Sequence, residues 1–246
     1  MVKKVRMVLH KFFFEFSKIP YTHSGVISSM NAMNKLISKK IFIKYKIKVP
    51  SYVFLDKKKY IDSKLRKELK IKKLKFPLVV KPNSEGSSIG VKICKNLFIL
   101  RENIKSLFKS YDSLIIENFI GGQEIQVAVL NGKALGAIEL RPKRKFYDYK
   151  AKYSLSAKTE HLIPVNLSSK NMNKVLNISL KAHNCLGCKG VTRSDFKFYN
   201  NKFYLLEVNT QPGMTKLSLV PEIAAYMGMN FLNLLEWILN DASTNK

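Results

Sequence analysis

The sequence predicts an α+β protein built from two lobes with a cleft between them. Strands and helices are mixed within two successive units of the chain, which is typical of α+β lobes. The 246 residues are 46% hydrophobic and 25% charged, so they can bury a large core. No internal repeat or low-complexity linker separates the units. Because nucleotides and other ligands commonly bind in clefts between lobes, we expect the functional site at their junction.

The first lobe is predicted to cover residues 20–112. It follows residues 1–19, which do not form a self-sufficient unit. Apolar periodicity and the Pro and Gly positions define its elements. Residues 57–75 are rich in lysine and predict a solvated stretch. The remaining elements, in order, are a helix at 28–45, a strand at 50–55, a buried strand at 76–81, a loop at 83–90, a strand at 91–94 and a helix at 97–110.

The second lobe is predicted to cover residues 113–246. It contains the hairpin on which most of the functional prediction depends, formed by two strands near the C-terminus. The other elements, in order, are strands at 114–117, 124–130 and 134–140, a polar loop at 141–160, a helix at 168–185, and after the hairpin two helices at 219–227 and 231–239.

The formal net charge of +27 is the unusual number in the composition. Such a charge favours RNA, DNA or an anionic membrane as a partner. However, nearly all of the basic residues are Lys, and direct readers of bases and phosphates favour the Arg fork. Lys, Asn, Ile and Phe also share A/T-rich codons, so mutational bias explains the charge about as well. We therefore expect no nucleic-acid partner.

The cysteines and the apolar runs indicate the compartment in which the protein is located. Cys185 and Cys188 form a CxxC pair, but no second pair completes a zinc site, so buried thiols are favoured over a metal or redox role. No apolar run approaches the ~20 residues of a membrane span. The basic, aromatic start lacks a small-residue cleavage site, which argues against a secretory signal. These features agree with a reducing cytoplasm.

The predicted hairpin carries the strongest chemical signal. Two strands joined by a tight turn bring Asp195 and Glu207 across from each other, and period-2 alternation places Asn209 on the face of Glu207. Three oxygen ligands around one point suit a hard cation such as Mg²⁺, with phosphates and water completing its shell. Arg193 shares the face of Asp195 and adds a cationic fork for a phosphoryl oxygen. The alternative is an ordinary hairpin with exposed acids.

The register of this hairpin sets a condition on its loop. Asp195 and Glu207 face each other in a regular hairpin only if the loop has an odd number of residues, for instance 200–202. A two-residue loop of Asn200 and Asn201 would place them on opposite faces and break the site.

Two further segments have a composition suited to a nucleotide. The loop at 82–90 follows a strand that ends in Lys81, and its small residues allow backbone N–H groups to close on phosphate oxygens. It is neither a Walker loop nor a dinucleotide fingerprint, and a flexible turn is the alternative. The strand at 115–120 ends at Gly121 and Gly122; it offers contacts to adenine and ribose, or only crosses between the lobes.

Taken in order, these stretches resemble D-alanine:D-alanine ligases of the ATP-grasp superfamily. The resemblance is colinear over about nine tenths of the chain, and its combination of motifs is specific. It implies that ATP phosphorylates one D-alanine carboxylate and that the amine of a second D-alanine attacks the acyl phosphate, in the synthesis of peptidoglycan precursors. The motifs are those at 19–26, 33–35, 79–90, 116–117, 146–153, 187–195, 204–210, 212–215 and 218–221.

The resemblance also implies roles for individual residues and a homodimer. Contacts to ATP phosphates fall to Lys35, Lys81 and Lys152, and contacts to adenine and ribose to Glu117, Ile120 and Glu124. Magnesium or manganese ligands are Asp195, Glu207 and Asn209, while Arg193 and the backbone N–H of Gly213 stabilise developing negative charge. Ser87 and Tyr153 close over the substrates, and Ser218 and Leu219 hold the second carboxylate. Without the resemblance, Lys35, Lys152 and Tyr153 read as solvated lysines and a packing tyrosine.

The sequence also departs from the family. The N-terminal α/β domain is largely missing, and residues 9–15 are interpreted as a collapsed remnant of one of its loops. Asn34 replaces the usual acid of a Met-Asp-Lys motif. Three alternatives to an active ligase therefore stay open: an inactive nucleotide-binding remnant, another ATP-grasp carboxylate–amine ligase, and a polyanion-binding protein.

Overall fold

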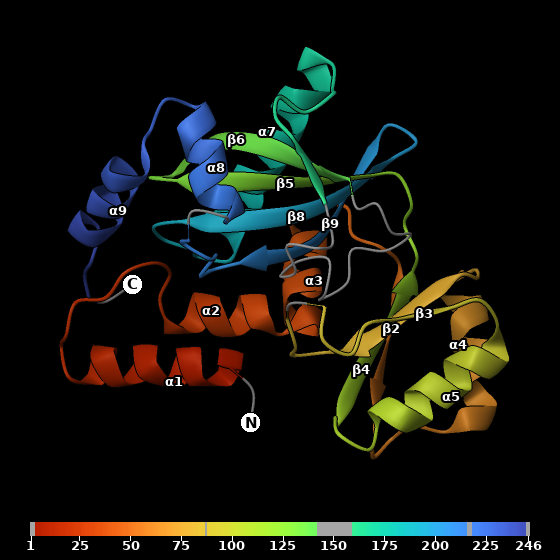
Figure 1. Ribbon diagram of the computed structural model, residues 1–246. Helices are drawn as coiled ribbons and strands as arrows, with labels where there is room; N and C mark the ends of the chain where they lie inside the picture. The colour runs from red at the N-terminus through yellow and green to blue at the C-terminus, as the bar shows by residue number, and fades with distance from the viewer. Residues whose placement is uncertain (1–2, 87, 142–158, 216–217, 245–246) are drawn as a thin grey trace.

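The structure is a computed structural model that describes residues 3–86, 88–141, 159–215 and 218–244. Two antiparallel sheets, each covered by helices, lie at an angle to each other (Figure 1). The first sheet has the strand order β1-β4-β2-β3, and the second has the order β7-β6-β5-β8-β9. The predicted α+β class with two lobes is confirmed.

The four-stranded sheet consists of β1 (Tyr52–Asp56), β2 (Leu78–Pro82), β3 (Lys92–Cys94) and β4 (Ser113–Asn118). Helices α4 (Asp62–Ile71) and α5 (Leu97–Leu107) contribute to its core. The prediction of a solvated stretch at 57–75 is wrong, because α4 lies within it. Leu65 and Leu69 are buried one turn apart while the charged residues between them stay exposed, so the helix is amphipathic despite its charge.

The first sheet extends further along the chain than the predicted lobe boundary at residue 113. Strand β4 pairs with both β1 and β2, with Glu117 opposite Tyr52 and Val79. The crossover to the second sheet follows at Gly122, whose φ is +77°. A Cβ atom there would lie 2.2 Å from the carbonyl oxygen of Phe198, so only glycine fits this close approach.

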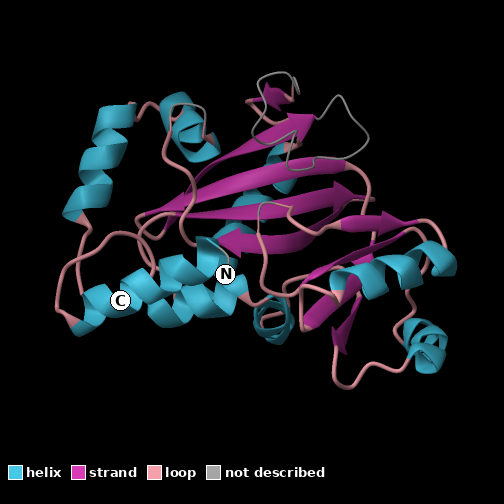
Figure 2. Cartoon of the chain, turned by 60° about the horizontal axis from the view of Figure 1, so that its bottom comes forward, coloured by secondary structure: helices cyan, strands magenta, loops and turns pink. Residues whose placement is uncertain are grey.

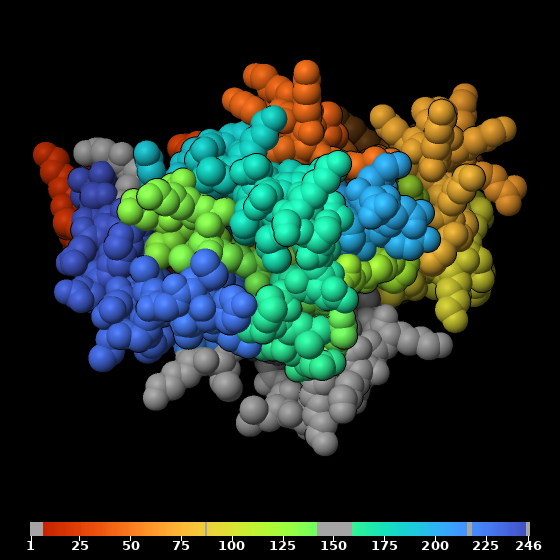
Figure 3. Space-filling model, turned by 90° about the horizontal axis from the view of Figure 1, so that it is seen from above, coloured from red at the N-terminus to blue at the C-terminus, as the bar shows by residue number. Residues whose placement is uncertain are grey.

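The five-stranded sheet consists of β5 (Gln123–Leu130), β6 (Lys133–Arg141), β7 (Glu160–Leu162), β8 (Thr192–Tyr199) and β9 (Lys202–Asn209). Helix α7 (Ser169–Cys185) packs on one face, while α8 (Leu219–Tyr226) and α9 (Phe231–Asn240) pack on the other. Each face has its own apolar core, as expected for a sheet buried on both sides. The space-filling view shows α7 between the α8–α9 segment and the β8–β9 hairpin (Figure 3).

Two helices join the lobes. The helical pattern predicted at 28–45 is confirmed, but it forms two helices, α2 (Val26–Met33) and α3 (Lys35–Lys44). The break occurs at Asn34, whose side chain caps α3 by accepting a hydrogen bond from the Ile37 N–H at 3.1 Å. Ala32 and Phe42 place both helices on the core of the five-stranded sheet. Helix α3 thereby lies where the two sheets meet (Figure 1).

The N-terminal stretch forms helix α1 (Lys3–Phe16), which lies alongside α2 (Figure 2). Residues 9–15, interpreted as a remnant of a loop of the family, are therefore helical in this chain. Lys11 is buried and donates to the Ser24 carbonyl at 2.7 Å and to Ser29 Oγ at 3.1 Å, which fixes α1 to the adjoining segment. Among the described residues, no helix has both the length and the apolar character that crossing a membrane requires.

Candidate active site

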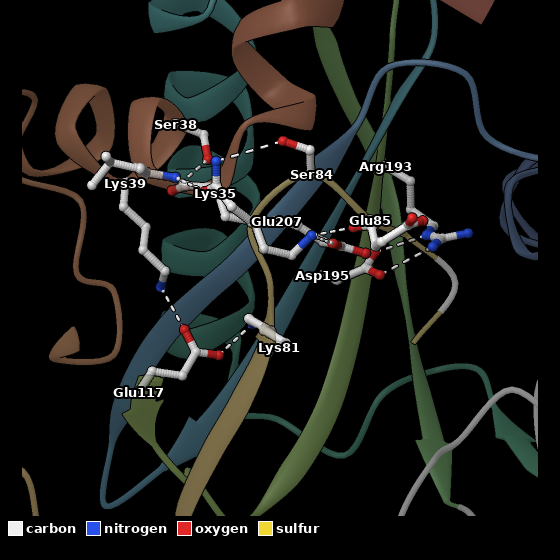
Figure 4. A network of polar contacts seen from close by, with 12 residues as sticks. Lys35, Ser38, Lys39, Lys81, Ser84, Glu85, Glu117, Arg193, Asp195 and Glu207 are labelled. Atoms are coloured by element: carbon white, nitrogen blue, oxygen red, sulfur yellow. Dashed lines mark hydrogen bonds and ion pairs between the residues drawn. The ribbon is translucent and has the colours of Figure 1, made fainter. Parts of the chain in front are cut away.

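The two sheets and α3 enclose a cleft that collects seven of the predicted site residues. Strands β2 and β4 form one wall, and β8 and β9 form the other (Figure 4). Seven predicted residues line this cleft: Lys35, Lys81, Glu117, Ile120, Glu124, Asp195 and Glu207. Residues more than a hundred positions apart in the sequence therefore meet at the predicted lobe junction.

The hairpin presents its acids as predicted, but by a different backbone route. Asp195 pairs with Glu207 and Arg193 pairs with Asn209. The loop, however, contains only Asn200 and Asn201, with φ values of 47° and 55°, as in a type I′ turn. The predicted three-residue loop is wrong.

A β-bulge explains why the two-residue loop does not break the site. The register shifts between Asp195 and Phe196, because Phe196 pairs with Leu205 whereas Asp195 pairs with Glu207. Leu206 is the additional residue on β9, and it returns Glu207 to the face of Asp195. Leu206 itself lines the cleft.

Cations hold the hairpin acids in position. Arg193 binds Asp195 through two contacts, Nε to Oδ1 at 2.8 Å and Nη2 to Oδ2 at 3.0 Å. Lys35 Nζ lies 3.7 Å from Glu207 Oε2 and also donates to the carbonyl oxygen of Glu85. The side chains of Arg193 and Glu207 are only partly buried, at 16% and 22% exposure. This wall therefore has oriented charges that remain accessible to water.

The donor set of the hairpin fits a hard divalent cation. Asp195, Glu207 and Asn209 supply carboxylate and amide oxygens from paired positions of two strands. The Asn209 Oδ1 accepts a hydrogen bond from the Gln211 N–H at 3.2 Å, which orients its amide. Two carboxylates and one amide oxygen leave positions for phosphate oxygens and water, as Mg²⁺ prefers.

The opposite wall is a buried charge cluster. Glu117 is 3% exposed, its Oε1 accepts from Lys81 Nζ, and its Oε2 lies 2.9 Å from Lys39 Nζ. Burial by itself would raise the pKa of Glu117, but Lys39 and Lys81 outweigh burial and lower that pKa to about 2. Burial also lowers the pKa of Lys39, a shift that Glu117 opposes. The carboxylate is therefore ionised and oriented before any ligand binds.

The floor of the cleft combines apolar and paired charged groups. Val79, Phe119, Ile120 and Leu206 provide apolar contacts. At one end, Lys197 Nζ lies 3.0 Å from Glu124 Oε2. Such a slot suits a flat aromatic group with a polar edge.

Sequence reasoning missed three charged residues of this region: Lys39, Glu85 and Lys197. Lys197 follows Arg193 and Asp195 at period 2 on β8, so strand alternation was the available signal. Lys39 follows Lys35 by one helical turn on α3, but it was one of many lysines. Glu85 is 6% exposed and lines the cleft inside the predicted loop.

The last group of predicted residues lies at the loop before α8. Gly213 and Ser218 are adjacent in space, since a Cβ atom on Gly213 would lie 2.8 Å from Ser218 Oγ. That hydroxyl accepts from the Thr215 N–H at 3.1 Å. The Leu219 side chain is buried in the core beneath α8. The predictions for Ser87, Lys152 and Tyr153 fall outside the described residues.

Comparisons with known proteins agree on one family. Residues 41–240 match the family model described as the D-ala D-ala ligase C-terminus. The chain is 63% identical over 232 residues to a D-alanine--D-alanine ligase of Pelagibacter ubique, covering 94% of this chain and 75% of the relative. It is 44% identical to that of Geotalea uraniireducens, covering 93% of this chain and 72% of the relative.

Solved structures give the same result. The D-alanine--D-alanine ligase from Bacillus anthracis superimposes with a TM-score of 0.82 at 35% identity, covering 94% of this chain and 74% of that one. A structure of the Bacillus anthracis ligase complexed with ATP gives a TM-score of 0.81 at 31% identity, covering 94% and 73%. The fold is therefore the ATP-grasp fold of these ligases.

Proposed function

The chain belongs to the D-alanine–D-alanine ligase family, and we propose that it joins two D-alanine molecules in a reaction driven by ATP and dependent on Mg²⁺ or Mn²⁺. The pairing of Asp195 with Glu207 across a bulge, opposite the buried Glu117 cluster, carries this proposal. One wall supplies an oxygen ligand set for a cation, while the other supplies lysines for phosphates and an apolar slot for adenine.

The proposed reaction has two steps. A D-alanine carboxylate oxygen attacks the γ-phosphorus of ATP, ADP leaves, and an acyl phosphate forms. The neutral amine of a second D-alanine then attacks the acyl carbon, and the tetrahedral intermediate loses a proton from nitrogen and expels phosphate to leave the peptide bond. Both steps bring anions together, so cations and fixed donors are the groups that can lower the barrier.

Each residue of the site has a separate proposed role. Lys35 and Lys81 contact ATP phosphates, while Ile120 and Glu124 contact adenine and ribose. Arg193 stabilises charge that develops near the transferred phosphoryl group, since its guanidinium is already fixed by Asp195. A divalent cation held by Asp195, Glu207 and Asn209 would offset the charge of the phosphates.

The loop before α8 is proposed to receive the second D-alanine. Ser218 and the backbone N–H of Leu219 hold its carboxylate, and the Gly213 N–H stabilises the oxyanion of the intermediate. Lys152 is proposed as a further phosphate contact, and Ser87 and Tyr153 as residues that close over the substrates. The proposed setting is the synthesis of peptidoglycan precursors in the cytoplasm by a homodimer.

A second candidate is nucleotide binding without ligation. The relatives extend beyond the matched region, which is about three quarters of their length. If residues of their remaining quarter complete the first D-alanine pocket, this chain binds ATP without turning it over.

The release of ADP, measured with and without D-alanine, separates the two candidates. D-alanine-dependent release by the wild-type chain, abolished by Asp195→Asn, is the result expected of a ligase. ATP binding without D-alanine-dependent release would refute ligation and favour the second candidate. A panel of other amino acids tests the substrate, because turnover confined to another amino acid would contradict the proposal.

A further inference from the structure

Lys39 is one of the largest side chains that are completely buried in the described part of the chain, and the proposed reaction assigns it no role. It is 0% exposed and lies one helical turn after Lys35 on α3. Lys35 lines the cleft, whereas Lys39 lies behind the wall and does not line it. A fully buried ammonium ion is costly unless it is paired, so its position calls for a physical reason.

The contacts of Lys39 lead directly to the cleft. Its Nζ lies 2.9 Å from Glu117 Oε2 and 5.4 Å from the centroid of the Tyr52 ring. Glu117 binds Lys81 through its other oxygen, and both Glu117 and Lys81 line the cleft. Lys39 therefore touches a residue of the cleft without reaching the cleft itself (Figure 4).

The charges of this cluster explain its arrangement. Glu117 and Lys81 alone would form a neutral pair, so the positive charge of Lys81 would be largely cancelled where a phosphate should bind. With Lys39 behind the carboxylate, two cations share one anion and the cluster keeps a net charge of +1. Because all three groups are at most one tenth exposed, this excess charge is weakly screened.

We propose that Lys39 is a positioning residue that neutralises Glu117 from behind and thereby leaves the charge of Lys81 available to the phosphates of the nucleotide. This inference rests on the proposed nucleotide function and goes beyond it by assigning a charge-balancing role to a residue that touches no ligand. Lys81 and Glu207 are the other charged groups that act on Lys39, and neither acts on it as strongly as Glu117 does.

The proposal predicts opposite effects for the two partners of one ion pair. Lys39→Met keeps the length of the side chain and removes its charge, so the cluster becomes neutral. Glu117→Gln removes the negative charge, so the net charge becomes +2. The double variant returns the net charge to +1. Lys40→Met is the matched control, because Lys40 is the exposed neighbour on the same helix.

The readout is the ratio of the affinities for ATP and adenosine, measured by calorimetry at one Mg²⁺ concentration. This ratio isolates the phosphate contribution, which a merely structural loss would not change selectively. We expect Lys39→Met to lower the ratio about tenfold. Glu117→Gln should raise it, the double variant should return it close to the wild-type value, and Lys40→Met should leave it unchanged.

An unchanged ratio in folded Lys39→Met would overturn the inference. If Lys39→Met does not fold, Glu117→Gln decides, because a ratio that falls or stays constant in that variant is equally contradictory. Wild-type protein that shows no preference for ATP over adenosine would instead refute the proposed nucleotide function. A wild-type preference that the variants leave unaltered would refute only the role of Lys39.

Discussion

The two walls of the cleft carry similar charges in opposite environments. On the four-stranded side, the side chains of Lys39, Glu117 and Lys81 are 0%, 4% and 10% exposed. On the five-stranded side, Asp195 is also buried, at 6% exposure, but Arg193 and Glu207 are 16% and 22% exposed. The four-stranded wall therefore holds all three of its charges dry, while the hairpin leaves the partners of Asp195 partly in contact with water.

This difference matches the two parts of a metal–nucleotide ligand. Fixed charges in a dry wall act strongly on phosphates and require no reorganisation. A divalent cation, by contrast, keeps several of its water molecules and suits oxygen ligands at a wetter edge. We therefore attribute nucleotide positioning mainly to the four-stranded wall and cation binding to the hairpin.

The largest expected effect comes from breaking the acid pair of the open wall. Deletion of Glu207 removes the bulge and places Leu206, rather than a carboxylate, opposite Asp195. D-alanine-dependent ADP release should fall by about 10³-fold or more, because the carboxylate pair is lost. Circular dichroism and thermal melting establish whether the variant is folded.

Deletion of Leu206 is the matched control for the loss of the bulge. Glu207 then follows Leu205 directly and pairs with Asp195 in a regular hairpin with a two-residue loop. Turnover should therefore be retained at least in part. A folded Glu207 deletion that retains wild-type turnover would refute the assignment of the hairpin acids.

The five-stranded lobe also contains a buried titratable group, His183, behind its open wall. Burial, reinforced by Lys189, lowers the pKa of His183 from 6.5 to about 4, and its Nδ1 lies 2.8 Å from Thr192 Oγ1. As the pH falls, the unfolded chain binds a proton at this histidine before the folded chain does. The contribution of neutral His183 to stability is therefore fully present above pH 6.5 and is lost as the pH falls toward 4. We expect a loss of about 3 kcal/mol in the free energy of unfolding.

Urea titrations between pH 7 and pH 4 measure this loss. His183→Gln should show a shallower dependence on pH over the same interval, because it removes the titrating group. An equal slope in both proteins would show that the dry interior of this lobe does not extend to His183.

A smaller effect is expected from crowding the loop beside the open wall. Gly213→Ala places a Cβ atom 2.8 Å from Ser218 Oγ. The contact should cost about 1–3 kcal/mol of stability or displace the loop. Adding Ser218→Ala should relieve part of the loss in melting temperature, but turnover should stay low if Ser218 binds substrate. Full recovery of turnover would contradict that role.

The smallest effect should come from the end of the cleft where the walls meet. Glu124 pairs with Lys197 at 3.0 Å and is proposed to contact the ribose. Glu124→Gln should reduce the preference for ATP over 2′-deoxy-ATP by about tenfold. Competition binding with both nucleotides measures this preference. An unchanged preference would contradict a contact between Glu124 and the ribose.

Sequence patterns predicted the pairing of Asp195 with Glu207, because strand alternation depends on local periodicity. They did not predict the bulge at Leu206, since a bulge leaves no mark in composition and is fixed by packing. The break at Asn34 was missed for a related reason: Asn is tolerated in a helix interior and favoured at a cap, and tertiary contacts decide between the two.

Charge composition concealed two features of the four-stranded lobe. The lysines of α4 masked a helix whose burial depends on Leu65 and Leu69 alone. The same abundance hid Lys39, which differs from its neighbours only in the partner that folding brings to it from β4. A long-range ion pair of this kind has no signal in a single sequence.

The most direct test of the two-wall account is the Mg²⁺ dependence of ATP affinity in the wild type and in Asp195→Asn. In the wild type, Mg²⁺ should strengthen ATP binding, because the hairpin is proposed to bind the cation together with the phosphates. Asp195→Asn should still bind ATP through the buried wall but lose most of that Mg²⁺ enhancement. A variant that keeps the full enhancement would show that the hairpin is not the cation site.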